Sequence, residues 1–532
     1  MSKMSYLKPN VKFEPLIWRW YAWPHLIQPL TAGCNVLDRH LKIMESFIQS
    51  PEIHEQSLKI PEMIGGPFAN IHKSRVGEVE SLLKKTNEWC ESIINLAIDY
   101  KKFDIFLQEN AHGYSLDNFY KEAPVSLDGM FELVYDGNNS PKIRLFETFI
   151  YKNYYNKNNQ CCVMSSIEND NRPFLLSTPR LEDENELAIN LEFSNPLYDN
   201  LFAAKYEPVD KFKLFESLEI PTRKYNYFSE FFSDEKSIQN KPHDFSEHEL
   251  RVRYFGHATI LLETKDCSIL IDPIISYSYN QIIDRYTYND LPEKIDYVLL
   301  THNHQDHIQI ETLIQLRHRI NYIVVPSNNP GSIFDPSMKL ILQKLGFNRV
   351  ISLDDFESIQ LNNGKILSLP FLGEHADLPI YTKAAYCIIL GKKKLLFAAD
   401  SNNLCKSLYS QIYSFVGTID ILFLGMECEG APLSWVYGPL TSKRLERKMD
   451  NSRRLSGSNS DKDLDVAKQL GSKEIYVYAM GMEPWLSYIM GLSYSDDSIQ
   501  IQESNKFISR CRQQGKISKR LYGKEEFTYS VN

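Results

Sequence analysis

The 532-residue sequence predicts an α/β protein with two domains, a large mixed α/β domain at residues 1–245 and a layered α/β domain at 246–532. The chain is long enough to bury more than one core, and its 43% hydrophobic and 24% charged residues are typical of a globular protein. The pattern of apolar residues changes near residue 250, directly after a polar stretch at 233–249. We therefore expect this stretch to be the linker between the domains.

The first domain combines helical and strand patterns. In residues 76–100, apolar side chains recur with a period near 3.6, which predicts an amphipathic helix packed against a core. Residues 130–139 and 142–151 predict a β-hairpin, because an Asp-Gly pair and two asparagines at the end of the first segment are typical of a turn.

After residue 250, short apolar strands alternate with helices, which is the pattern of a layered α/β domain. The expected strands are 250–264, 267–274, 296–302, 321–327, 383–390, 393–400, 420–427 and 474–481. The expected helices are 311–319 and 463–471. Residues 452–463 are rich in serine and charge and predict a mobile loop whose arginines are solvated.

Charge and cysteine usage narrow the class of protein. The net charge of −9 argues against a surface devoted to nucleic acid or anionic lipid. The nine scattered cysteines include no CxxC pair, which favours reduced thiols in a cytoplasm. No signal peptide and no apolar run of about 18 residues is present, so we expect a cytoplasmic protein without membrane insertion.

A dense group of metal-binding residue types follows the expected strand 296–302. His302 and His304, two residues apart on an extended segment, point to the same side and can bind one cation. Asp306 and His307, where the chain turns into the next helix, can face a second cation. Burying these four groups is costly unless a metal neutralises them, so the HxHxDH pattern predicts a dinuclear metal site.

This pattern and its flanks at 255–264 and 270–273 resemble the metallo-β-lactamase family, in particular its lactonase-like and phospholipase-like branch. The resemblance covers residues 246–490 and implies an αββα sandwich. It also implies that Asp400, at the end of the strand 393–400, is the carboxylate that bridges both metals. His257 and Asp272 are expected in contact with the ligands or in the loop beneath the site, with a purely structural role equally open.

Two departures separate the sequence from the hydrolases of that family. Where they carry a histidine between the HxHxDH pattern and the bridging aspartate, this chain offers Glu374, with His375 as the alternative if the alignment is one residue off. No histidine follows His375, so the final histidine ligand of the hydrolases is missing as well. The resulting site is rich in oxygen ligands, which suit iron that must bind O2.

Through these departures and the stretch 426–440, the sequence resembles the dinuclear-iron β-hydroxylases. This is the family of the aminoacyl β-hydroxylase of chloramphenicol biosynthesis. The resemblance implies the metal ligands His302, His304, Asp306, His307, Glu374 and Asp400. His302, His304 and Glu374 would hold one iron. Asp306 and His307 would hold the other, and Asp400 would bridge them. It further implies an oxo- or hydroxo-bridged pair of iron ions with O2 as co-substrate. Glu374, Asp400 and Glu427 are the expected catalytic residues, with Glu427 either gating the pocket, hydrogen-bonding a ligand, or serving a surface or structural role.

The same resemblance implies partners. In that family the substrate is an amino acid held as a thioester on the phosphopantetheine arm of a nonribosomal peptide synthetase carrier domain, and the product is the β-hydroxy amino acid of an antibiotic pathway. An electron donor, which the sequence leaves unidentified, is also needed. We expect a homodimer in which residues 1–245 provide dimerisation and carrier docking. Trp18, Trp20 and Trp23 are expected to lie partly in this interface, because one core has little room for all three, with burial inside a self-contained core equally open for each.

Other interpretations remain open. A dinuclear zinc hydrolase that opens a lactone, phosphodiester or thioester would share every ligand except Glu374 and the missing histidine. A catalytically silent scaffold would bind a partner through the first domain. The basic run 442–448 contains four cations, which either guide an acidic carrier domain or cover a solvated helix face.

Overall fold

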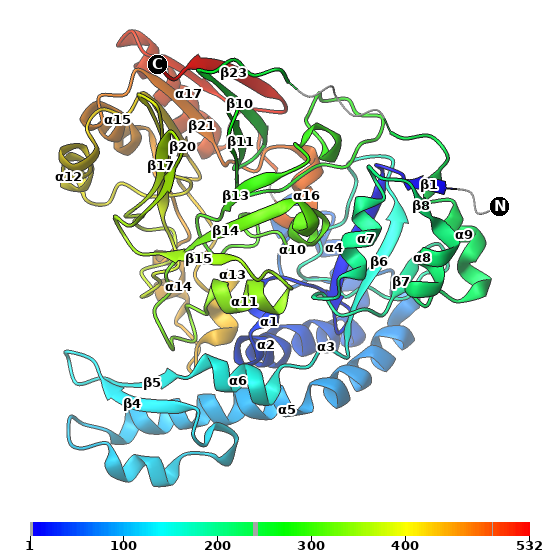
Figure 1. Cartoon of the computed structure of the whole chain (residues 1–532). Coiled ribbons are helices and arrows are strands. Elements are labelled where there is room, and N and C mark those ends of the chain that lie inside the picture. Colours follow the sequence, from blue (N-terminus) through cyan, green and yellow to red (C-terminus); the bar gives the residue numbers. More distant parts are fainter. Residues whose placement is uncertain (1–3, 238–242, 492) are drawn as a thin grey trace.

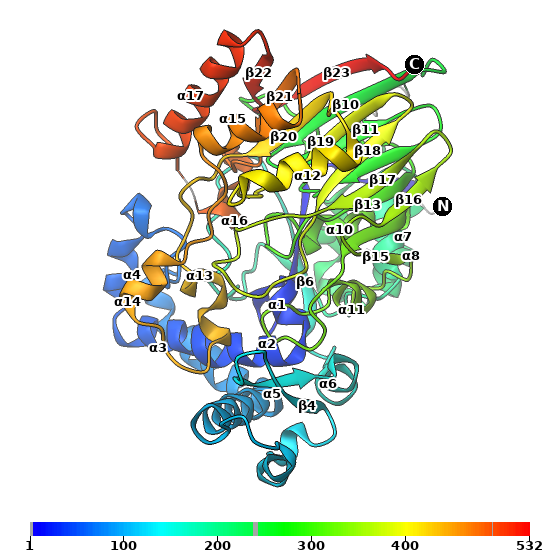
Figure 2. The same cartoon turned by 90° about the vertical axis from the view of Figure 1, so that its left-hand side faces the viewer.

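The computed structural model describes residues 4–237, 243–491 and 493–532, and Figures 1 and 2 show their arrangement. Residues 238–242 of the expected linker lie outside the described residues. The chain before this gap and the chain after it form two regions that pack along a broad contact. Among the described helices, none combines the length and the apolar character needed to cross a membrane.

The C-terminal region contains two seven-stranded sheets stacked face to face. The first sheet has the order β15 (Val350–Leu353), β14 (Ile320–Pro326), β13 (Ile295–Leu299), β12 (Ser268–Ile271), β11 (Thr259–Glu263), β10 (Glu249–Gly256) and β23 (Glu525–Ser530). The second has the order β16 (Ser358–Leu361), β17 (Gly364–Leu369), β18 (Ala385–Leu390), β19 (Lys393–Phe397), β20 (Ile421–Gly425), β21 (Glu474–Tyr478) and β22 (Ile517–Arg520). Ile260 and Leu262 point into the core between the sheets, whereas Leu261 packs on the outer face. This alternation follows from the two-residue period of a strand.

Helices cover the outer faces of both sheets. The first sheet is covered by α10 (Ile310–Leu316) and α11 (Met338–Lys344), and the second by α12 (Lys406–Val416), α15 (Ser460–Gln469) and α17 (Ile499–Gln513). The short helices α13 (Ser434–Tyr437), α14 (Arg447–Ser452) and α16 (Ser487–Met490) lie in the long connections of the second sheet. The expected αββα sandwich is therefore confirmed.

The N-terminal region is built on a small antiparallel sheet and a long helix. The sheet has the order β3 (Trp20–Tyr21), β2 (Val11–Ile17), β6 (Gln160–Ser166) and β7 (Leu187–Ile189); a second small sheet has the order β8 (Val209–Asp210), β1 (Met4–Leu7) and β9 (Phe232–Ser233). The helices are α1 (Pro24–Ile27), α2 (Pro29–Asn35), α3 (Leu41–Gln49), α4 (Pro51–Ser57), α5 (Val76–Asn110), α6 (Glu147–Tyr154), α7 (Leu197–Ala203), α8 (Lys211–Ser217) and α9 (Tyr225–Ser229). Helix α5 packs against α2, where a Cβ on Gly33 would lie 2.1 Å from the Ile93 carbonyl oxygen. Only glycine permits this close approach.

Two local expectations were wrong. The hairpin of β4 (Phe131–Tyr135) and β5 (Pro141–Leu145) ends earlier than predicted, because α6 buries Glu147, Ile150 and Tyr151 on one helical face. Residues 452–463 also do not form a free loop with solvated arginines. Leu455 N donates to Ala431 O at 2.8 Å, and Arg454 Nε donates to Gly430 O at 2.7 Å. These bonds attach the segment to the loop after β20.

The tryptophans do not form the expected interface. Trp18, Trp20 and Trp23 are 5%, 1% and 5% exposed within the single chain. The Trp20 ring stacks on the His40 ring at a centroid distance of 3.9 Å. The core formed jointly by the two regions is larger than the N-terminal region alone could provide, and it accommodates all three side chains.

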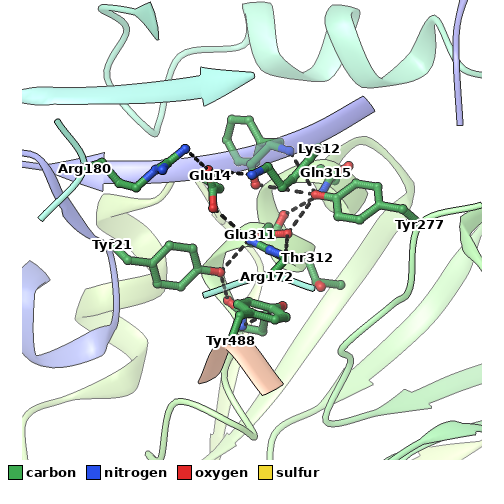
Figure 3. A network of polar contacts seen from close by, with 12 residues as sticks. Lys12, Glu14, Tyr21, Arg172, Arg180, Tyr277, Glu311, Thr312, Gln315 and Tyr488 are labelled. Atoms are coloured by element: carbon green, nitrogen blue, oxygen red, sulfur yellow. Dashed lines mark hydrogen bonds and ion pairs between the residues drawn. The ribbon is translucent and has the colours of Figure 1, made fainter. Parts of the chain in front are cut away.

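A buried polar network joins α10 to the N-terminal region (Figure 3). Glu311 accepts two hydrogen bonds from Arg172 at 3.0 and 2.9 Å, one from Tyr21 at 2.7 Å and one from Tyr277 at 2.8 Å. Arg172 also lies 3.2 Å from Glu14 of β2. Because α10 begins three residues after the HxHxDH pattern, this network anchors the end of the metal-site loop.

Candidate metal centre

The four residues of the HxHxDH pattern lie in the loop between β13 and α10. His302, His304 and His307 are buried, and Asp306 is nearly so. The His307 N–H donates to the His304 carbonyl at 3.0 Å, so the loop turns tightly. This turn directs all four side chains into one region.

Three more carboxylates reach the same region from loops of the second sheet. Glu374 lies between β17 and β18, Asp400 follows β19 and Glu427 follows β20. Strands β19 and β20 are parallel neighbours, so their carboxyl ends lie at one edge of the sheet. Gly425 at the end of β20 leaves room for the carboxylate, because a Cβ there would lie 2.6 Å from Asp400 Oδ1.

The side chains form two overlapping groups of potential ligands. One group is His302, His304 and Glu374, and the other is His302, His307 and Asp400, with ligand atoms within 4.8 Å of one another in each. His304 Nδ1 lies 2.8 Å from Glu374 Oε1, and His307 Nε2 lies 2.8 Å from Asp400 Oδ2. Asp306 Oδ2 is 3.7 Å from His307 Nε2. The structure thus brings all six expected ligands together.

Hydrogen bonds select the ring nitrogen that each histidine presents to a metal. His307 Nδ1 lies 2.7 Å from Asp272 Oδ2, so Nδ1 carries the proton and Nε2 presents a lone pair. Asp272 also accepts bonds from Thr301 N at 2.8 Å and Thr301 Oγ1 at 2.6 Å. His304 Nε2 lies 2.9 Å from the Tyr437 hydroxyl, which leaves its Nδ1 facing Glu374.

His257 lies beside the ligands, with its Nε2 directed toward Asp306. Its Nδ1 accepts a bond from Gly481 N–H at 3.0 Å, so the neutral ring carries its proton on Nε2. That nitrogen lies 3.3 Å from Asp306 Oδ2. Although His257, Asp306 and His307 also lie within ligand spacing, His257 orients the aspartate instead of offering a lone pair.

Glu374 and His375 occupy different positions at the site. The His375 ring stacks on His304 at a centroid distance of 4.6 Å, and its Nδ1 lies 3.2 Å from Glu374 Oε2. Among the described residues, the groups with ligand spacing include Glu374 but not His375. Glu374 reaches its position through a left-handed backbone with φ of +65°.

The burial and charge of the site fit a bound cation. Burial raises the pKa of Glu374 to about 7 despite the nearby His304. Burial and the neighbouring Asp400 raise the pKa of Glu427 well above its usual range. His302 Nε2, His307 Nε2, Glu374 Oε2 and Asp400 Oδ1 are buried and make no hydrogen bond within the described part of the chain. Three imidazoles and several carboxylates with unused donor atoms fit a pair of metal ions.

A cavity of about 660 Å³ lies over the centre. It is lined by His304, Asp306, Glu374 and Glu427 on one side and by Trp435, Val436, Ile489 and Met490 on another. Tyr494 also lines it, and its buried hydroxyl has no hydrogen-bond partner in the described residues. Sequence reasoning did not single out Trp435, Tyr437 or Tyr494. The first two lie in the stretch 426–440, but no local pattern distinguishes them from core residues.

Comparisons with known proteins agree with the overall fold. Residues 6–236 match the diiron non-heme β-hydroxylase N-terminal domain, and residues 251–427 match a β-lactamase superfamily domain. The 4-amino-L-phenylalanyl-(CmlP-peptidyl-carrier-protein) 3-hydroxylase of Streptomyces venezuelae is 33% identical over 97% of this chain and 98% of its own. The crystal structure of CmlA, a diiron β-hydroxylase from the same organism, superposes with a TM-score of 0.93 over 99% of this chain and 100% of its own, at 32% identity. A UPF0173 protein of Pyrococcus abyssi is 28% identical over 33% of this chain and 69% of its own.

Proposed function

The chain belongs to the family of diiron non-heme β-hydroxylases, and we propose that it hydroxylates the β-carbon of an amino acid carried as a thioester on a peptidyl carrier protein. Two iron ions are its cofactor and O2 is its co-substrate. One oxygen atom enters the C–H bond, and the other leaves as water with two electrons and two protons from an external reductant. The similar enzyme from Streptomyces venezuelae acts on an aminoacyl group on such a carrier.

The observation that best supports this function is the oxygen-rich donor set. Glu374 lies where hydrolases of the metallo-β-lactamase type place a histidine, and its Oε2 is buried without a hydrogen bond. The final histidine of those hydrolases is also absent. The segment after β21 instead binds His257 through Gly481 N–H. A nitrogen-poor site of this kind favours iron over zinc, so the hydrolase interpretation is not favoured.

We assign the metal ligands from the geometry. His302, His304 and Glu374 would hold one iron, and Asp306 and His307 the other, with Asp400 between them. The irons, when bound, supply the activation of O2. Asp272 holds the Nδ1 proton of His307, so that this imidazole binds through Nε2. Tyr437 accepts the Nε2 proton of His304 in a hydrogen bond, so that this imidazole binds through Nδ1.

The cavity walls position the substrate. Trp435, Val436 and Met490 present apolar surface, which excludes water from the reacting carbon. Glu427 lines the same cavity, and burial raises the pKa of its carboxyl. Its carboxyl can hydrogen-bond a ligand in the cavity, which is the role we propose for it.

We also propose that residues 1–245 provide the dimer contact, together with carrier docking. The three tryptophans do not support this contact, because they are buried within the chain. Support comes instead from exposed apolar side chains near the hairpin β4–β5. Tyr114 and Val125, near the hairpin β4–β5, are 82% and 91% exposed, and Phe149 of α6 is 48% exposed. Figure 1 shows that this part of the chain projects from the body of the molecule. Sedimentation of the Val125→Asp variant should show dissociation of a wild-type dimer.

The test of function compares one aminoacyl group in two forms. Iron-loaded enzyme, a chemical reductant and ¹⁸O₂ are mixed either with an aminoacyl-loaded carrier domain or with the free amino acid. We expect one labelled oxygen atom in the carrier-bound product only, together with two iron ions per chain. Two zinc ions with hydrolysis of the thioester, or equal turnover of both forms, would contradict the proposal.

A further inference from the structure

Three cavities with shared lining residues lie in sequence between the surface and the metal centre. A surface groove of about 1150 Å³ lies between α3, α5 and residues 434–450. It shares the lining residues Arg39, Ile43, Pro67 and Ser434 with a smaller cavity of about 260 Å³. The smaller cavity shares Gly66, Gln305, Pro432, Trp435 and Val436 with the cavity over the metal centre.

The surface groove is strongly basic. Its lining includes six cationic residues, Arg39, Lys42, Lys101, Lys102, Arg444 and Arg447, and two acidic residues, Asp38 and Asp450. This local excess of four positive charges stands against a net charge of −9 for the whole chain. Residues 438–440, between α13 and α14, pack against α2 and against residues 36–40, which precede α3.

Only part of this charge is neutralised by neighbouring groups. Asp38 pairs with Lys42 and with Lys101, which lies 2.6 Å away. Within the described residues, the side chains of Lys102, Arg444 and Arg447 make no hydrogen bond or ion pair, and all three residues are exposed. The unpaired cations come from α5 on one wall and from the basic run 442–448 on the other.

The lining of these cavities changes character with depth. Between the basic groove and the metal, the smaller cavity is lined mainly by apolar groups such as Trp23, Phe174 and Trp435. Its polar contacts are Arg39 at the groove end, Gln305 and two serines. Away from the smaller cavity, the metal cavity is lined by Glu429 and by serines of residues 493–500. Its cation Arg454 already donates to Gly430 O at 2.7 Å. Of these two surfaces, the basic groove is therefore the better binding site for an anionic group.

Given the proposed function, we propose that the basic groove binds the phosphate of the phosphopantetheine arm and that the arm passes through the smaller cavity to the metal centre. The phosphodiester is anionic, which matches Arg444, Arg447 and Lys102. The arm beyond it is narrow and uncharged, which matches the apolar walls at Trp23 and Trp435. The thioester end then lies in the cavity that contains Glu427.

Binding of small probes to the iron-loaded full-length protein tests this assignment. The probes are 4′-phosphopantetheine and pantetheine, which differ only in the phosphate, and calorimetry gives both Kd values. We expect the double variant Arg444→Ala/Arg447→Ala to raise the Kd of 4′-phosphopantetheine about tenfold, because two charge-assisted contacts are lost. The Kd of pantetheine should not change.

The matched control is the double variant Lys443→Ala/Lys448→Ala. It removes the same amount of charge from the same run, but neither lysine lines the groove, and Lys443 instead lies 3.3 Å from Glu109. We expect wild-type Kd values for both probes. Iron content and circular dichroism of each variant verify that the fold is retained.

Three outcomes would overturn the proposal: equal affinity of wild-type protein for both probes, an equal effect of the control variant, or slower turnover of carrier-bound substrate without a change in probe binding. The last outcome would assign the arginines to the surface of the carrier domain instead of the phosphate. Hydroxylation of a loaded carrier by the wild-type enzyme is measured in parallel. It separates a failure of the groove assignment from a failure of the proposed function.

Discussion

The hydroxyl oxygen of Tyr437 lies 2.9 Å from Nε2 of His304, although 133 positions separate the two residues. Nδ1 of the same ring lies 2.8 Å from Glu374 Oε1, and when Nδ1 binds a metal, the Nε2–H donates to the Tyr437 oxygen. A residue of α13, which lies beside the proposed substrate path, therefore sets the tautomer and orientation of an expected metal ligand.

Replacing Tyr437 with phenylalanine should weaken metal binding. The ring remains, but Nε2–H of His304 loses its acceptor, and removal of such a partner typically lowers metal affinity about 10–100-fold. Competition with a calibrated chelator measures the change for iron. The control is Tyr198→Phe, which removes a buried hydroxyl bonded to Leu191 O at 3.0 Å in the N-terminal region. Unchanged affinity in Tyr437→Phe would show that the contact has no such role.

Replacing Glu374 with histidine should shift the metal preference toward zinc. The substitution makes the ligand set richer in nitrogen, and it removes a carboxylate whose charge helps to balance iron. We expect a lower iron-to-zinc ratio in protein loaded from an equimolar mixture, together with reduced hydroxylation. If Glu374→His retains full iron and full activity, His375 becomes the candidate ligand.

Replacing Arg172 with methionine should destabilise the junction between the two regions. The change leaves Glu311 and Glu14 buried without their shared cation, which costs about 3–5 kcal/mol for pairs of this kind. Urea unfolding measures this loss, and adding Glu311→Gln should recover part of it. Arg144→Met, which breaks the exposed pair with Glu132, should cost at most about 1 kcal/mol. Equal losses in both variants would contradict the proposed importance of burial.

Glu147 should make stability fall as pH rises. Burial raises the pKa of this carboxyl to about 7 in the folded chain, against 4.5 as its ordinary value. Between these values the unfolded chain loses the proton first, so up to about 3 kcal/mol of stability is lost as pH rises from 4.5 to 7. Glu147→Gln should therefore be more stable than wild type at pH 8 and equal to it at pH 4.5.

Urea unfolding at these two pH values and at pH 6 measures the difference for Glu147→Gln. The control is Glu132→Gln, at a half-exposed position of the hairpin β4–β5, where the carboxylate pairs with Arg144. A variant that gains nothing at pH 8, or gains the same at every pH, would show that the charge of Glu147 is not the cause.

Much of the fold could be predicted from the sequence because its signals are local. The unbroken apolar run Ile260, Leu261 and Leu262 predicts a strand buried on both faces, and the structure has this arrangement. The helix predicted at 76–100 is present within α5. By contrast, the folding of residues 147–151 into α6 depends on which side chains the rest of the chain buries, and the local pattern did not reveal it.

For the metal centre, the sequence by itself determined that His302, His304, Asp306 and His307 lie close together, because six consecutive residues cannot separate. Only the tertiary structure decided how Glu374 and Asp400 approach them and that Tyr437 and Asp272 select the ring nitrogens. It also decided that Trp18, Trp20 and Trp23 are buried. The physical reason is that these contacts join segments far apart in the chain. Their distances depend on how the sheets and the N-terminal region pack, and no local spacing encodes that packing.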